Sequence, residues 1–203
     1  MIPAQPLLAL DCSFGALTIA LSHRSGTVAR HVSDHQASDA LHKASSQVIE
    51  EAGVTLPQIA TLAVTTGPGS FTGIRLGLAF SYALQSVNPN LTLVGLPTLP
   101  LLARQYHAEY KEESVTVLLD AAGGQLYAQS FDFKSNQAAA PRILTEAEIP
   151  PGPLYAPATL LLKESRFFNH LKPEILLAAA ADPSLHVPAT PFYLKPLAYK
   201  AQP

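Results

Sequence analysis

Residues 7–32 read LLALDCSFGALTIALSHRSGTVARHV, and this stretch says most about the fold. Its segments 7–11, 16–22 and 27–32 predict β-strands, because they are rich in Leu, Ile, Val, Thr and Ala. The breaks between them are short and contain Gly15 and the pair Ser25-Gly26, which are turn residues. Strands joined in succession by tight turns predict an antiparallel meander.

Helices and strands then alternate. Helical spacing of apolar residues predicts a helix over 38–52, with Ser38 as its N-cap and Gly53 as its stop. The further predictions are strands at 59–65, 91–95, 115–120 and 125–133, and helices at 72–88, 98–109, 158–168 and 173–180. A meander followed by helix, strand, helix and strand is not the order of a doubly wound Rossmann sheet. It predicts an α/β fold of the actin-like, ribonuclease-H-like (ASKHA) class, in which helices flank a mixed sheet. We place an N-terminal lobe at 1–110 and a smaller C-terminal lobe at 111–203.

Composition excludes several classes of protein. Of the 203 residues 48% are hydrophobic and 14% are charged, which is typical of a chain with a packed core and not of a disordered one. The net charge of −2 does not suit a protein that grips a phosphate backbone by itself. The single cysteine, Cys12, favours a reducing compartment, and we find neither a signal peptide nor a membrane span. We therefore expect a cytoplasmic protein.

The sharpest local feature is the sequence GPGSFTG at 67–73, between a predicted strand and a predicted helix. Backbone N–H groups at such a junction can hold an anion. Its glycine spacing fits neither a P-loop nor a dinucleotide fingerprint. One interpretation is a tight connection that lets the helix pack closely on the sheet; the other is a phosphate site involving Gly67, Gly69 and Ser70.

The predicted helix over 72–88 is apolar on two sides. One side carries Gly73, Leu76, Gly77, Phe80, Ala83, Leu84 and Val87, and the opposite side carries Ile74, Leu78, Ala79 and Tyr82 beside Arg75. A surface helix normally has one apolar stripe. The second side is covered either by the C-terminal lobe or by a partner protein, and we favour the partner because that lobe is short.

Asp11 and Asp120 each end a predicted strand. Acids in such positions flank magnesium and phosphates in actin-like phosphotransferases, so a weak nucleotide cleft near Asp11 and Ser13 is one interpretation. The other is that these carboxylates accept hydrogen bonds from turn amides. Cys12, Ser13 and Ser70 lack an evident paired histidine and acid, so we expect no nucleophilic catalysis.

The histidines give a weaker pattern. His31 and His35 are four residues apart, and His42 follows them. Because a break separates the first two and no third ligand is evident, we expect histidines that face solvent and no metal site.

Several motifs together resemble the TsaB (YeaZ-like) family. TGPGSFTGIRLG at 66–77 matches that family's hallmark, and LALDCS at 8–13, GLPTL at 95–99 and PFYLK at 191–195 resemble its other conserved segments. The resemblance covers about residues 7–130 and the last short motif. Departures occur at Ala37, Ala122, Gln125 and Lys195, and residues 134–190 have no clear counterpart.

The resemblance implies a non-catalytic subunit that binds and activates TsaD, the enzyme that transfers threonylcarbamoyl to the tRNA adenosine beside the anticodon. It also implies TsaE as a further partner, tRNA contact only through the complex, and no membrane. The two helices at 38–52 and 72–88 would form the dimer face, which a homodimer of the free protein could share. The expected contact residues are Ser38, Leu41, Ser45, Ile74, Arg75, Leu78, Ala79 and Tyr82. We expect no cofactor beyond a weakly held nucleotide. The alternative function is an ATP-dependent phosphotransferase of the actin-like class, and we find no constellation that supports the family's older glycoprotease label.

Overall fold

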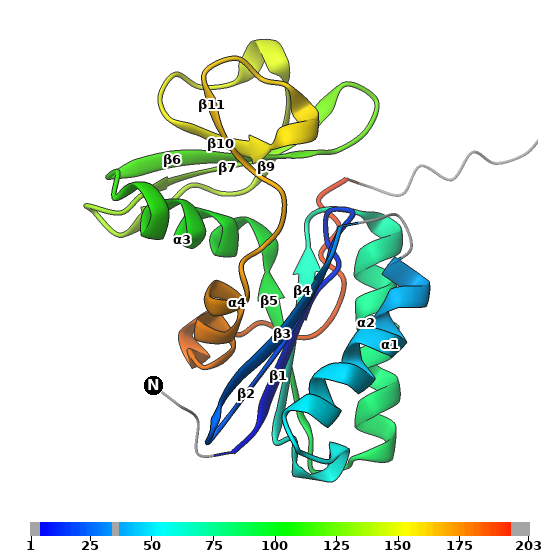
Figure 1. Cartoon of the computed structure of the whole chain (residues 1–203). Coiled ribbons are helices and arrows are strands. Elements are labelled where there is room, and N and C mark those ends of the chain that lie inside the picture. The colour runs from blue at the N-terminus through cyan, green and yellow to red at the C-terminus, as the bar shows by residue number, and fades with distance from the viewer. Residues whose placement is uncertain (1–4, 34–36, 196–203) are drawn as a thin grey trace, which may run out of the picture.

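The computed structural model describes residues 5–33 and 37–195, without the side chains of residues 37–39. Within these residues the strands form two sheets, stacked as a lower and an upper lobe in Figure 1. The fold is the predicted mixed α/β arrangement, in which helices flank mixed sheets.

The first sheet has the strand order β3-β2-β1-β4-β5. Its strands are β1 (Leu7–Asp11), β2 (Leu17–His23), β3 (Gly26–Val32), β4 (Thr61–Gly67) and β5 (Thr92–Pro97). Strand β1 pairs antiparallel with β2, which pairs antiparallel with β3, so the predicted meander is confirmed. Strand β1 also pairs parallel with β4, and β4 pairs parallel with β5, so the sheet is mixed.

Helices cover both faces of the first sheet. On one face α1 (Ala37–Glu51) packs on β2 and β3, and α2 (Phe71–Val87) packs on β4, β5 and β1. On the other face α4 (Pro173–Ala180) packs on β1 and β2. The side chains of β1 alternate between the two layers: Leu8 and Leu10 face α1 and α2, whereas Leu7 and Ala9 face the opposite core. This explains why the whole of β1 is buried.

The second sheet has the order β11-β10-β6-β7-β8, and β9 pairs with β7. The strands are β6 (Ser114–Asp120), β7 (Gln125–Asp132), β8 (Gln137–Ala138), β9 (Arg142–Thr145), β10 (Leu154–Pro157) and β11 (Ser165–Phe168). Helix α3 (Thr98–Tyr110) lies between this sheet and the first. Short 3₁₀ turns occur at Leu56–Gln58, Glu146–Glu148, Ala158–Leu160 and Pro183–Leu185. The helix predicted over 158–168 is wrong, because a 3₁₀ turn and β11 occupy it.

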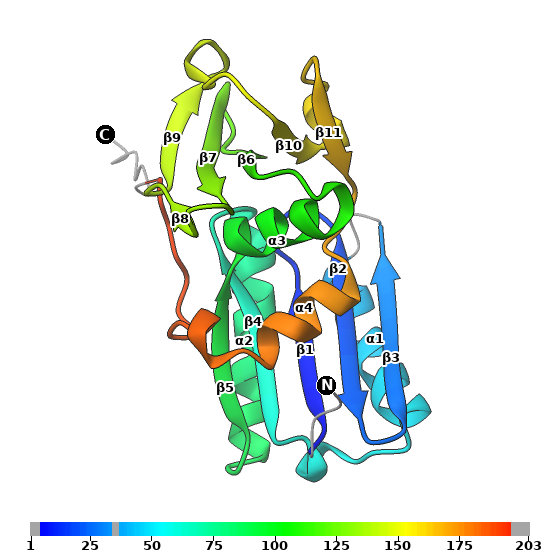
Figure 2. The ribbon, with the colours of Figure 1, turned by 90° about the vertical axis from the view of Figure 1, so that its left-hand side faces the viewer.

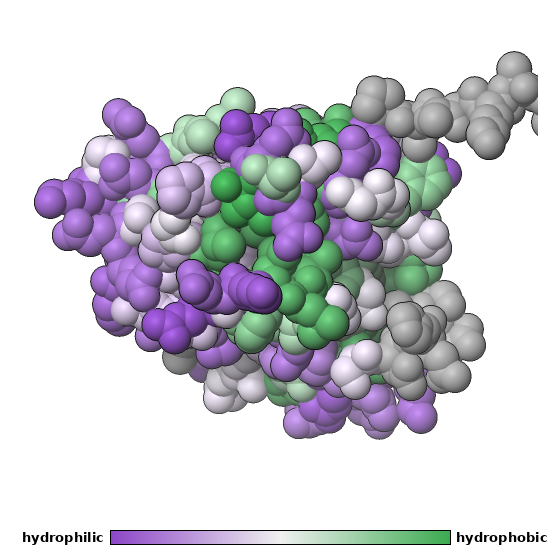
Figure 3. Space-filling model, turned by 90° about the horizontal axis from the view of Figure 1, so that it is seen from above, coloured by the Kyte–Doolittle hydropathy of each residue, from purple (hydrophilic) through white to green (hydrophobic). Residues whose placement is uncertain are grey.

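The outer face of the second sheet holds a small cluster around Leu118, Leu126 and Leu144, and Ile149 and Leu160, from the segments before and after β10, pack against it. Seen from that side, apolar side chains gather in the middle of the face and hydrophilic ones surround them (Figure 3).

The chain returns to the first lobe after β11. Helix α4 packs on the first sheet, and Val187 forms an antiparallel bridge with Gly95 of β5. Helix α4 and Val187 therefore pack on the first lobe, although the predicted boundary assigns them to the second. Among the described helices, none combines the length and the apolarity needed to cross a lipid bilayer.

Candidate functional site

A cleft of about 640 Å³ lies between the lobes, at the carboxyl ends of β1, β4 and β6. Six segments contribute to its wall: the turn after β1, the junction between β4 and α2, the end of β6 with the turn after it, β7, the end of β10 with the turn after it, and the C-terminal segment. The lining residues are Ser13, Phe14, Gly15, Gly69, Ser70, Phe71, Leu119, Asp120, Ala121, Ala122, Tyr127, Pro157, Thr159, Tyr193 and Lys195.

The junction between β4 and α2 is held in place by its own hydrogen bonds. The Gly67–Pro68 peptide bond is cis, and Ser70 is the N-cap of α2. The Ser70 hydroxyl accepts a hydrogen bond from the Gly73 N–H at 3.1 Å, and the Ser70 N–H donates to the carbonyl of Ser13. The start of α2 is thus fixed against the turn that follows β1.

Asp11 lies below the cleft and not in its wall. The carboxylate is 1% exposed, and its Oδ1 accepts hydrogen bonds from the Ser13 N–H at 3.0 Å, the Ser13 hydroxyl at 2.6 Å and the Thr65 hydroxyl at 2.7 Å. Burial raises the pKa of Asp11, while these hydrogen bonds act in the opposite direction. The arrangement matches the second interpretation of this acid, a carboxylate that organises a turn.

Asp120, in contrast, is exposed and lines the cleft. Its Oδ1 accepts a hydrogen bond from the Ala122 N–H at 2.8 Å, so it too shapes the turn that follows its strand. Of the residues predicted to lie near a phosphate, Ser13, Gly69 and Ser70 line this cleft. Gly67 lines a separate, proline-rich groove with Pro68.

The predicted outer side of α2 is wrong in two of its residues. Ile74 and Leu78 are 1% and 3% exposed and belong to the core between the first sheet and its helices. On α1, Leu41 and Ser45 are also buried, at 2% and 3% exposed. These four side chains are covered by the chain itself, and they are not available to a partner in this conformation.

The exposed stripe of α2 is rotated from the predicted one. Arg75, Ala79 and Tyr82 lie on it, as predicted, together with Phe71 and Ser86. Tyr82 is 46% exposed and Phe71 39%. Ser38 lies in the first turn of α1, one residue after the helix begins, and its side chain is outside the described residues.

The histidines do not converge on one point. The His31 ring lies 3.9 Å from that of His170, centroid to centroid, and its Nδ1 lies 3.3 Å from the Thr18 hydroxyl. His42 is exposed on α1, and His35 lies outside the described residues. Within the described part of the chain, no three His, Cys, Asp or Glu side chains are grouped as metal ligands would be.

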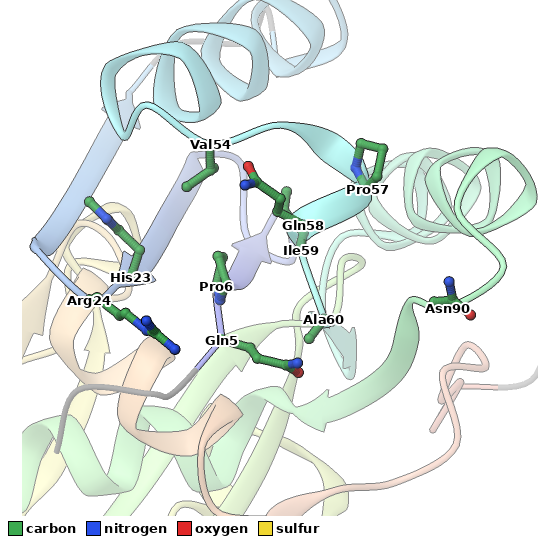
Figure 4. Close-up of a pocket in the computed structure, with 10 residues that line it drawn as sticks. All are labelled: Gln5, Pro6, His23, Arg24, Val54, Pro57, Gln58, Ile59, Ala60 and Asn90. Carbon is green, nitrogen blue, oxygen red and sulfur yellow. The ribbon is translucent and has the colours of Figure 1, made fainter.

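A second hollow, of about 690 Å³, lies at the opposite end of the first sheet. It is lined by the residues before β1, the β2–β3 turn and the segments on either side of the Leu56–Gln58 turn, and it contains the polar side chains of Gln5, Arg24, Gln58 and Asn90 (Figure 4). None of the residues predicted for partner or ligand binding lines it.

Sequence reasoning missed the part that the C-terminal motif plays at the cleft. Tyr193 and Lys195 line it, and the Lys195 ammonium donates hydrogen bonds to the carbonyls of Ala121 and Ala122 at 3.0 and 3.1 Å. The available signal was the motif at 191–195 itself, whose only interpretation was a family resemblance.

Comparison with known protein families shows to which family this chain belongs. A family model described as TsaD, tRNA N6-adenosine threonylcarbamoyltransferase, matches residues 17–157, more than half of the chain. The chain belongs to this family. Curated proteins named tRNA threonylcarbamoyladenosine biosynthesis protein TsaB confirm the resemblance to TsaB. The match to the protein of Buchnera aphidicola (subsp. Schizaphis graminum) is 33% identical over 81 residues, 40% of this chain and 38% of the relative. The match to that of Escherichia coli (strain K12) is 28% identical over 123 residues, 60% of this chain and 52% of the relative.

The solved structure of YeaZ from Pseudomonas aeruginosa has the same fold. It superposes with a TM-score of 0.76 at 21% identity, over 94% of this chain and all of that one. The chain spans about half the length, or less, of the curated TsaB proteins that it matches in sequence.

Proposed function

We propose that this protein is a non-catalytic subunit of the cytoplasmic machinery that makes threonylcarbamoyladenosine in tRNA, and that it binds a TsaD-type enzyme through α2. The names of its relatives and of its family support this role. TsaE is a further partner in the proposal, and tRNA is contacted through the complex.

The observation that carries the proposal is the exposed stripe of α2. Phe71, Arg75, Ala79, Tyr82 and Ser86 recur every three or four residues, so they lie along one side of the helix. On α1, by contrast, the described exposed residues are polar or charged: His42, Lys43, Ser46, Gln47, Glu50 and Glu51. Compared with the rest of the protein surface, protein–protein interfaces are enriched in aromatic residues and arginine and depleted in lysine and glutamate. We therefore place the centre of the contact on α2, with α1 at its rim.

Co-purification with the TsaD-type protein of the same organism tests the contact. Tyr82→Asp puts a charge in the middle of the proposed interface, so we expect at least about a hundredfold loss of affinity, the size of a hot-spot substitution. Phe167→Asp is the matched control, because Phe167 is 49% exposed on β11 of the other lobe. Equal binding by both variants, or no complex with the unchanged protein, would refute the proposal.

The free protein offers a related measurement. If the α2 stripe also forms a homodimer, light scattering will show dimers that Tyr82→Asp converts to monomers, and the TsaD-type protein will compete with self-association. A dimer that survives this substitution would place self-association on another surface.

The absence of catalysis in this chain is a separate part of the proposal. It is supported by Asp11, whose carboxylate is enclosed by Ser13 and Thr65. We expect Asp120→Asn and Ser70→Ala to leave tRNA modification by the assembled complex within about threefold, since removal of a catalytic group generally costs a hundredfold or more. A loss of that size, with the complex intact, would assign chemistry to the cleft.

If the cleft binds a ligand, we expect a nucleotide. The alternative function for this protein is an ATP-dependent phosphotransferase. Asp11 does not line the cleft, which disfavours the alternative. Calorimetric titration with ATP and magnesium separates them: weak or no binding is expected, and tight binding abolished by Asp120→Asn would favour the alternative.

A further inference from the structure

The C-terminal segment from Val187 to Lys195 runs along the first lobe and reaches the second. Val187 exchanges two backbone hydrogen bonds with Gly95 of β5, at 2.8 and 3.0 Å, and the Phe192 N–H donates to the carbonyl of Thr66 at 2.8 Å. Figure 2 shows the segment rising beside β5 toward the upper lobe. We call residues 187–195 the C-terminal strap.

Close approach fixes the strap against the sheet. A Cβ atom on Gly95 would lie 2.5 Å from the carbonyl oxygen of Pro188, so any side chain there would displace the strap. The strap is thus built into the edge of the sheet, and its path is set by the backbone of β5.

The strap is also held by the exposed stripe of α2. The Tyr82 hydroxyl donates a hydrogen bond to the carbonyl of Ala189, and the Arg75 Nε donates to the Tyr193 hydroxyl at 2.8 Å. The Tyr193 ring lies 5.3 Å from the Phe71 ring, and the Arg75 guanidinium carbon lies 3.7 Å from the centre of the Phe71 ring. Three residues of the stripe therefore contact the strap.

At its far end the strap holds the turn after β6. The Lys195 ammonium donates to the carbonyls of Ala121 and Ala122, which line the cleft on the side of the second lobe. Ala122 has a φ of +57°, in the left-handed region that non-glycine residues adopt at some cost. The Lys195 ammonium supplies both carbonyls of this turn with a hydrogen-bond donor and so stabilises its conformation.

We propose that the C-terminal strap couples the outer side of α2 to the cleft. The two states are a turn held by Lys195 and a turn released from it, and the contacts of Arg75 and Tyr82 bias the equilibrium between them. A protein that docks on Arg75 and Tyr82 changes those contacts, and it thereby changes the wall of the cleft on the second lobe. The docking step rests on the proposed function, but the coupling within the chain does not.

Hydrogen exchange of the free protein tests the internal coupling. Lys195→Met removes the ammonium and keeps an unbranched side chain, so we expect the amides of residues 120–125 to exchange about fivefold faster, the effect of losing a typical net hydrogen bond. Tyr193→Phe removes only the hydroxyl that accepts from Arg75, and we expect it to accelerate the same amides. Lys195→Arg restores donors to the carbonyls and is expected to restore the slow exchange. Lys163→Met, an exposed lysine elsewhere in the second lobe, is the control.

The outcomes separate the two proposals. Acceleration by Lys195→Met without acceleration by Tyr193→Phe would overturn the coupling, because the strap would then hold the turn independently of α2. Unchanged exchange in both variants would overturn the role of the strap altogether. Addition of the TsaD-type protein should alter exchange at residues 120–125 in the unchanged chain and not in Lys195→Met. Failure of that protein to bind would refute the proposed function while the results on the free chain still stand.

Discussion

Asp11 illustrates how a conspicuous acid can be structural. Its position at the end of β1 made it a candidate phosphate or magnesium residue, and the sequence also allowed a role in shaping the turn. The side chain reaches Ser13 and Thr65, which lies on β4, and the partner 54 residues away in the sequence could not be read from the local pattern. The residues of the β4–α2 junction were easier to place, because their glycine spacing alone predicts a turn that opens a helix.

Substitution of Asp11 should affect stability in a pH-dependent way. Burial raises the pKa of Asp11 in the folded state, so the folded protein keeps this proton to a higher pH than the unfolded chain does. The contribution of Asp11 to the free energy of unfolding therefore falls as pH rises above about 4, where an unfolded aspartate ionises. Asp11→Asn removes this charge and keeps an acceptor, so its stability relative to the unchanged protein should improve between pH 4.5 and pH 7. Asp11→Ala leaves the Ser13 and Thr65 donors unpaired and should cost about 2–4 kcal/mol at pH 4.5, and less at pH 7, because it too lacks the buried carboxylate.

Urea denaturation followed by circular dichroism measures these differences. A constant difference between Asp11→Asn and the unchanged protein at pH 4.5 and pH 7 would show that the burial of this carboxylate carries no net cost.

Helix α2 shows what periodicity can and cannot predict. Its bounds were predicted within one residue, and its two-sided apolar character was recognised. Which side of the helix faces the sheet was not predicted correctly. Apolar residues occupy most of the circumference of α2, so the hydrophobic pattern does not single out one buried side. The core also includes Ser81, whose hydroxyl donates to the carbonyl of Gly77, so one of the buried positions is polar.

Glycine substitutions in α2 test its close packing on the sheet. A Cβ on Gly73 would lie 1.9 Å from the carbonyl oxygen of Cys12, and only movement of the helix could relieve that clash. A Cβ on Gly77 would lie 3.1 Å from Leu10 Cδ1, a side-chain atom that can shift. We expect Gly73→Ala to cost more than about 3 kcal/mol and Gly77→Ala about 1 kcal/mol or less, since overpacking is offset there by the better helix propensity of alanine.

Thermal unfolding of the two variants, each compared with the unchanged protein, gives this ranking. Equal losses of stability would mean that α2 moves as freely at its first turn as at its second.

The C-terminal third was predicted least well, for a physical reason. Strands β10 and β11 have four residues each, and such short segments carry too few positions for a pattern of alternation to be distinguished from a helical one. Helix α4, with Pro173 at its start, was predicted at its observed bounds because proline in the first turn is a strong signal.

The two lobes share one hydrophobic core. The largest cluster joins Ala9 and Leu96 of the first sheet to Val117 and Tyr155 of the second, with α3 and α4 between them. Gln105 of α3 adds a polar link, since its side chain donates to the Tyr155 hydroxyl at 2.8 Å and accepts from the Lys172 N–H at 2.7 Å. The division into 1–110 and 111–203 therefore describes sheets and not independent cores.

A shared core predicts a single unfolding transition. Tyr155 is fully buried in the second sheet, so Tyr155→Ala should lower the stability of the whole chain by about 3–5 kcal/mol. Native-state hydrogen exchange provides the measurement: amides of β1 and β6 should lose protection by the same free energy. Loss confined to β6 would show that the lobes unfold separately.

The bridge between Val187 and Gly95 also bears on the solubility of the protein. Strand β5 is the last strand on its side of the first sheet, and an open border of this kind recruits strands from other molecules into aggregates. The bridge pairs the backbone N–H and C=O of Gly95, in the middle of this edge strand, and so hinders pairing with a strand of another molecule. Proteolytic cleavage after α4 would remove this bridge and leave a folded protein whose exposed edge strand promotes aggregation.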